Sequence, residues 1–93
     1  MALVHNNITV GTTPTVLAQI PNGVGKVEVT IYNNDTYPIF VGDSSITVTA
    51  GSNQGLTIPK SLPYTITLNG NDILYGVSIS GTATGAVVVM YSA

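Results

Sequence analysis

Charged side chains are the scarcest feature of this 93-residue sequence. They make up 6% of the chain, against about 25% in an average globular domain. The formal net charge of −2 provides no basic surface, so we expect neither a nucleic-acid partner nor a membrane partner. Hydrophobic residues make up 44% of the chain, which is too apolar for a disordered segment. We expect one ordered domain over residues 1–93.

Cysteine and tryptophan are absent, and His5 is the only histidine. Without cysteine the chain forms no disulfide bond and no thiolate metal site. A single histidine and four acidic residues in separate segments make no recognisable zinc site or paired acid–base catalyst. We therefore expect no cofactor and no enzymatic activity. The first residues lack the basic and apolar regions of a signal peptide, so we expect synthesis in a cytoplasm.

Short runs of β-branched residues, separated by Gly, Pro, Asn and Asp, extend along the whole chain. No window has the apolar spacing of an amphipathic helix. Turn residues recur roughly every eight to ten positions, which predicts an all-β fold without significant helix, a single β-sandwich or small jelly roll of about eight or nine strands. The expected strands are Leu3–Val10, Thr15–Ile20, Gly25–Asn33, Pro38–Val41, Ile46–Thr49, Gly55–Ile58, Tyr64–Leu68, Ile73–Ser80 and Ala86–Tyr91. Residues 1–7 could extend as an N-terminal arm, and Asn69-Gly70 predicts a tight turn.

The last expected strand, residues 86–91, is apolar on both faces, because the run Val-Val-Val-Met fills alternate positions on each side. One face can join the core of the domain, whereas a chain of this length has little left to cover the other. We expect a neighbouring subunit to cover it. The residues expected at this oligomer interface are Val88, Met90, Tyr75 and Tyr91.

Several loops combine acidic, amide and aromatic side chains, which can bind sugars or other ligands. The candidate ligand loops contain Asn34, Asp35, Tyr37 and Asp72. Each of these acids also lies among residues that form turns, where a carboxylate caps its own backbone. The alternatives are therefore a carbohydrate- or receptor-binding module and purely structural loops.

The chain, mainly in its second half, contains the Gly- and Thr-rich segments Ile39-Phe40-Val41-Gly42, Ile46-Thr47-Val48-Thr49, Gly51, Gly55-Leu56, Leu74-Tyr75-Gly76-Val77-Ser78, Gly81-Thr82-Ala83 and Val87-Val88-Val89, with the opening Val10-Gly11-Thr12-Thr13-Pro14-Thr15. In these segments it resembles the capsid decoration, or cement, proteins of tailed bacteriophages. Similar domains also occur in phage fibres and tail parts.

The resemblance implies a structural virion protein, made in the host cytoplasm and located on the outer capsid surface. It would bind the major capsid protein as a homo-oligomer, a trimer, and stabilise the shell. An N-terminal arm could reach a neighbour by strand addition. The expected capsid-contacting residues of that arm are Leu3, Val4, His5 and Asn6. The alternative is the carbohydrate- or receptor-binding module, here as part of a phage fibre or tail.

Overall fold

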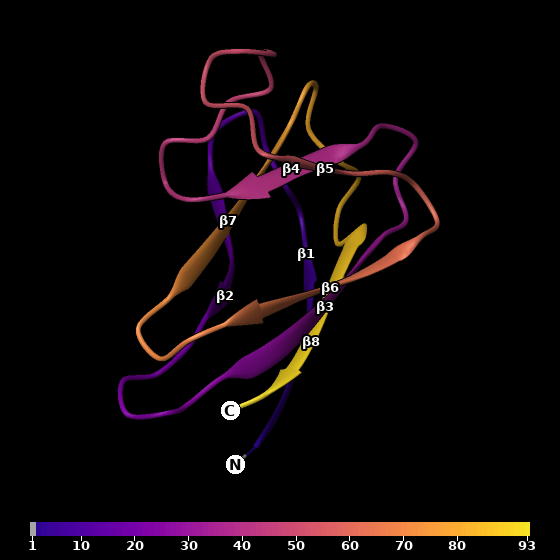
Figure 1. The fold of residues 1–93 in the computed structure, drawn as a ribbon. Coiled ribbons are helices and arrows are strands. Elements are labelled where there is room, and N and C mark those ends of the chain that lie inside the picture. Colours follow the sequence, from indigo (N-terminus) through magenta and orange to yellow (C-terminus); the bar gives the residue numbers. More distant parts are fainter. Residues whose placement is uncertain (1) are drawn as a thin grey trace.

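The computed structural model describes residues 2–93, and these residues form eight strands and no helix (Figure 1). The strands are β1 (Leu3–Ile8), β2 (Thr15–Gln19), β3 (Val27–Asn33), β4 (Ile39–Gly42), β5 (Leu56–Ile58), β6 (Pro63–Leu68), β7 (Ile73–Ser78) and β8 (Val87–Ser92). They form two four-stranded sheets, with the orders β1-β8-β3-β6 and β2-β7-β4-β5. Every pairing within the sheets is antiparallel. The all-β prediction is therefore confirmed.

The chain runs as one long hairpin that is folded over on itself. β1 pairs with β8, β2 with β7, β3 with β6 and β4 with β5, so each strand of the first half meets its counterpart in the second. The two termini consequently lie side by side, where Ala2 and Ala93 exchange two backbone hydrogen bonds of 2.9 and 3.0 Å (Figure 1).

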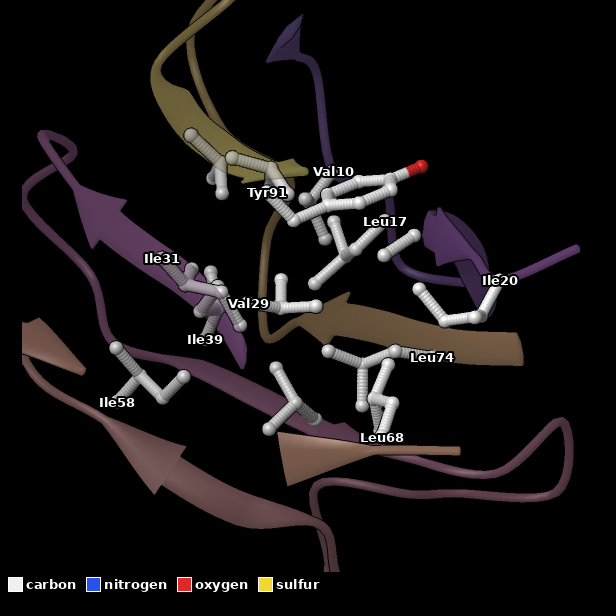
Figure 2. Packing of buried hydrophobic residues seen from close by; sticks show 14 of the residues in the cluster. Val10, Leu17, Ile20, Val29, Ile31, Ile39, Ile58, Leu68, Leu74 and Tyr91 are labelled. Carbon is white, nitrogen blue, oxygen red and sulfur yellow. The ribbon is translucent and has the colours of Figure 1, made fainter. Parts of the chain in front are cut away.

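The core lies between the sheets and follows from the period-2 alternation of the strands. In β3 the side chains of Val27, Val29 and Ile31 are buried, while Glu28 on the same strand is exposed. β8 contributes alternate residues in the same way, and the ring of Tyr91 lies over Leu17 of β2 (Figure 2). Largely apolar inner faces, with Asn33 and Ser78 as buried polar residues, hold the two sheets together without a disulfide bond.

The segment 46–49, predicted as a strand, is part of the β4–β5 loop. Its only strand-like contact is an isolated bridge between Thr47 and Gln54. The apolar pattern of this segment has another cause, because Ile46 packs on Phe40 and Val77 in a second buried cluster, joined by Val48. The loop thus covers part of the outward side of the β2-β7-β4-β5 sheet.

The expected N-terminal arm needs correction, whereas the expected tight turn between β6 and β7 is confirmed. Residues 3–7 do not extend as an arm, because they belong to β1, which pairs along its whole length with β8; Met1 lies outside the described residues. The predicted tight turn at Asn69-Gly70 is present, because the Asp72 N–H donates to the Asn69 carbonyl at 3.0 Å, and it connects β6 to β7 of the other sheet. The positive φ of that turn falls on Asn71, at 72°, and Gly70 is needed because a Cβ there would clash with the Val24 carbonyl oxygen.

Candidate functional site

No strand or loop packs as a buried cluster on the outward side of the β1-β8-β3-β6 sheet within residues 2–93, and we call this side the β1–β8 face. The registers place twelve alternate residues on it: Leu3, His5 and Asn7 from β1; Val88, Met90 and Ser92 from β8; Glu28, Thr30 and Tyr32 from β3; and Pro63, Thr65 and Thr67 from β6. Glu28 is the one charged side chain among these twelve. The surface therefore combines an unbroken antiparallel register with almost no charge.

The centre of this face is apolar because β8 carries hydrophobic residues on both sides. Val87 and Val89 point inward and are fully buried, whereas Met90 points outward with 45% of its surface exposed. Val88 is half-buried beside Tyr32, its direct partner on β3. The prediction that this strand is apolar on both faces is confirmed, and nothing within the described residues covers its outer side.

Threonine and histidine surround the apolar centre. Met90 lies between His5 on β1 and Thr30 on β3. The hydroxyl oxygens of Thr30 and Thr65 lie 3.2 Å apart across β3 and β6, so each hydroxyl has a partner within the face. Glu28 is the one charged residue around this centre, so a partner can approach most of the face without desolvating an ion.

The structure separates the four residues expected at one oligomer interface. Val88 and Met90 lie on the β1–β8 face, but Tyr75 points outward from the other sheet, where it packs beside the second cluster. Tyr91 belongs to the core, with 9% of its surface exposed and its hydroxyl donating to the Gln19 carbonyl at 3.5 Å. Alternation explains this, because Tyr91 has the inward parity of Val89. The four residues cannot form one continuous interface.

The residues expected on the capsid-contacting arm divide in the same way. Leu3, with 70% of its surface exposed, and His5 lie on the β1–β8 face beside β8. Val4 and Asn6 have the opposite parity and face the core side of β1. The two sets of residues predicted for separate contacts, Val88 with Met90 and Leu3 with His5, therefore share one surface.

The candidate ligand loops do not converge. The β3–β4 loop holds Asn34, Asp35 and Tyr37 at one end of the sandwich, and the β6–β7 loop holds Asp72 at the other, because β3 and β6 are antiparallel. The carboxylate of Asp35 accepts hydrogen bonds from the backbone N–H groups of Tyr37 and Ala83, at 3.3 and 3.1 Å.

Asp72 accepts a hydrogen bond from the Asn69 N–H at 2.7 Å. Asn34 makes a backbone bond from its N–H to the Ala86 carbonyl at 3.0 Å. Both acids thus cap turns of their own backbone, as their sequence context also suggested. The side chain of Tyr37 differs from these two acids, because half of its surface is exposed and available to a ligand.

The β4–β5 loop contains a compact polar network around Asp43. Its carboxylate accepts hydrogen bonds from the Ser45 hydroxyl and N–H, at 2.8 and 2.9 Å, and these bonds hold the pKa of Asp43 below its usual value. The Asn53 side chain donates to the Ser45 carbonyl and hydroxyl. The network stabilises the loop that carries Ile46. Elsewhere too, no group of three or more His, Cys, Asp or Glu side chains in residues 2–93 could hold a metal ion.

Asn33 is an important polar residue that sequence reasoning assigned only to a strand end. It is completely buried, and its side-chain amide donates to the carbonyls of Tyr37, at 2.9 Å, and Ile58, at 3.4 Å. Its side-chain oxygen, Oδ1, accepts a hydrogen bond from the Asp35 N–H at 3.0 Å. Asn33 therefore joins β3, the β3–β4 loop and β5. An asparagine at an inward position of an alternating strand was the available signal.

No pocket opens on the part of the chain that the structure describes. None of its elements is a helix long and apolar enough to cross a membrane. Comparisons with protein-family models, with curated proteins and with solved structures found no match to this chain. Function is therefore inferred from the chain's own surfaces, and above all from the β1–β8 face.

Proposed function

We propose that this chain is a structural virion protein, an outer capsid decoration or cement protein that binds a phage head as a homo-oligomer and stabilises the shell. The observation that supports this function is the β1–β8 face, a four-stranded surface with an apolar centre and a single charged residue. Isolated apolar residues on a surface need no explanation, but a contiguous uncovered patch indicates an interaction site.

The mechanism of such a protein is mechanical and requires no catalytic group. Each copy covers neighbouring major capsid proteins and removes apolar surface from water. Burying Leu3 and Met90, which are 70% and 45% exposed, would contribute about 1–2 kcal/mol per side chain, a fraction of the free energy for burying a whole residue. Many copies add these small terms over the shell. Because the face has almost no charge, binding would depend only weakly on salt.

The fold that we propose for this role is a jelly roll. The strand orders β1-β8-β3-β6 and β2-β7-β4-β5 support it, because they arise when one long hairpin with four pairs of strands is rolled into two sheets. This arrangement has the eight strands and two sheets of a jelly roll, an architecture found in viral capsid domains. Fold alone does not establish function, so the proposed function is based on the β1–β8 face.

The test is co-sedimentation with heads of the phage that encodes the chain, prepared without this protein. We expect saturable binding that changes less than about threefold between low and high salt, since neutral contacts are not screened. We also expect the decorated heads to release their DNA at a higher temperature. Absence of binding over the micromolar range would contradict the proposed function.

The alternative function, a carbohydrate- or receptor-binding module of a fibre or tail, is favoured by one observation, the half-exposed ring of Tyr37 at a loop end. Tyrosine can stack on a sugar ring. A glycan array probed with the wild-type protein and with Tyr37→Ala tests this alternative. Binding that is lost in the variant would support it, and no binding to any glycan would exclude a sugar ligand of the types on the array.

A further inference from the structure

A sandwich of two open sheets has four edge strands, here β1, β6, β2 and β5. An edge strand presents unpaired N–H and C=O groups, and proteins usually protect it with proline, a bulge, a nearby charge or a very short strand. Of these four edges, β1 lacks the protective features that the other three have.

Three of the edges are protected. β2 has a bulge between Val16 and Ala18. β5 is only three residues long and is followed directly by Pro59 and Lys60. β6 starts with Pro63, which has no N–H to donate. The bulge and the short length interrupt a regular ladder along β2 and β5, and Pro63 removes a donor at the start of β6.

β1 carries none of these features. Its six residues, Leu-Val-His-Asn-Asn-Ile, contain no proline and no Asp, Glu, Lys or Arg, and its register with β8 is unbroken. The reciprocal bonds between Ala2 and Ala93 show that Ala2 is a hydrogen-bonded position. Because such positions alternate along an antiparallel ladder, the backbone groups of Leu3, His5 and Asn7 point away from β8. They form a regular, unoccupied row of donors and acceptors.

The side chains of β1 also indicate that a neighbour belongs there. Val4 and Ile8 point toward the core but remain half-buried, because no strand lies beyond them. Another strand along this edge would cover both. Leu3 would gain a neighbour on the outer side, where it is now the most exposed large hydrophobic residue.

We propose that the β1 edge binds β1 of a second copy of this chain, antiparallel about a two-fold axis at His5. In this register His5 pairs with its own counterpart and Leu3 pairs with Asn7 of the other copy, so all the outward groups of those three residues are used. No like charges meet, since β1 contains no acidic residue, lysine or arginine. Two four-stranded sheets would join into one of eight strands, within the usual range of sheet sizes.

This inference does not depend on the virion role, and it replaces the trimer expected from sequence with a two-fold dimer. A six-residue strand is only about 20 Å long. Pairing along its edge therefore buries less area than the roughly 800 Å² per partner of a standard interface. We therefore expect a concentration-dependent dimer with a Kd in the micromolar range or weaker.

The absence of cysteine from the chain allows a direct test. Opposite residues of a hydrogen-bonded antiparallel pair have Cα atoms about 5.5 Å apart, a separation that a disulfide can span. Purified His5→Cys should therefore oxidise to a covalent dimer at least tenfold faster than Thr65→Cys, a matched control on the β6 edge of the same face. Equal rates for the two variants would contradict the proposed pairing.

Sedimentation velocity with the full chain provides the second test. The mass should rise from one copy to two between about 1 and 500 μM, as expected for a weak dimer. His5→Pro removes an outward N–H without removing a bond to β8, so it should abolish the dimer, whereas His5→Ala should retain it. Circular dichroism and the Tm would show that both variants fold. A monomer at every concentration, or a mass that rises to three copies, would overturn the inference.

Discussion

Replacement of Gly76 tests the packing between the two sheets most sharply. Gly76 lies on the inward side of β7, and a Cβ there would be 2.8 Å from Cδ1 and 3.1 Å from Cγ of Leu17. These distances are shorter than the contact distance of about 3.5–4.0 Å between carbon atoms. Leu17 is the extra residue of the β2 bulge and is 2% exposed, so it has little room to move.

Gly76→Ala should therefore destabilise the protein. Overpacking a core typically costs about 1–3 kcal/mol, which is offset in part by the gain of about 0.4–1 kcal/mol from a less flexible unfolded chain. We expect the free energy of unfolding to fall by about 1–2 kcal/mol, measured by urea denaturation at 25 °C. Gly25→Ala is the matched control, because a Cβ at Gly25 meets no atom within 4 Å. It should leave stability unchanged or raise it by about 0.4–1 kcal/mol, because only the unfolded-chain term remains.

A double-mutant cycle separates this contact from other effects of the substitution. Leu17→Ala alone should reduce stability by about 2–5 kcal/mol, as for other core truncations. In the double variant the new methyl group of residue 76 enters the space that Leu17 leaves, so the total loss should be smaller than the sum by about 1 kcal/mol or more. Additive losses, or a Gly76→Ala variant as stable as the wild type, would refute the reasoning.

Three further predictions concern polar groups. Ser78→Ala should leave stability unchanged or raise it by about 1 kcal/mol in thermal unfolding, because the buried Ser78 hydroxyl has no hydrogen-bond partner. Asn33→Ala should lower the free energy of unfolding by about 2–3 kcal/mol, since two carbonyls lose their donor, while Asn34→Ala changes it little. NMR titration should place the pKa of Asp43 below that of an unstructured aspartate. The ionised Asp43 carboxylate stabilises the fold. Because its folded-state pKa is depressed, this stabilisation is present above the unfolded-state pKa and is lost as the pH falls through the folded-state pKa. The Ser45 amide should lose its protection from hydrogen exchange over the same fall in pH. Retained protection in Asp43→Ala, which has no side-chain acceptor, would contradict that prediction.

The sequence was sufficient to predict the fold class and most strands, because burial and alternation are local patterns. Val27 to Tyr32 shows this clearly, since its inward and outward residues are as the pattern predicts. The segment 46–49 was assigned wrongly because a loop that covers a sheet and a strand within a sheet both need apolar residues. Only the tertiary contacts of Ile46 with Phe40 and Val77 distinguish the two cases.

The candidate site could be predicted only in part. The two-sided apolar character of β8 identified Val88 and Met90 correctly as outward residues. It could not exclude Tyr91, because which parity faces the core depends on the pairing with β1 and β3. The convergence of Leu3 with Met90 on one face likewise depends on a contact between the two ends of the chain, and no local pattern specifies that contact.

Binding of Met90→Glu to undecorated phage heads tests the central claim most directly. This substitution puts a charge at the centre of the β1–β8 face, and Thr57→Glu puts the same charge at an exposed position of β5 in the other sheet. We predict that Met90→Glu weakens co-sedimentation with heads at least tenfold, while Thr57→Glu binds like the wild type and both variants keep the wild-type Tm. Wild-type affinity in Met90→Glu would contradict the claim that the β1–β8 face contacts the shell.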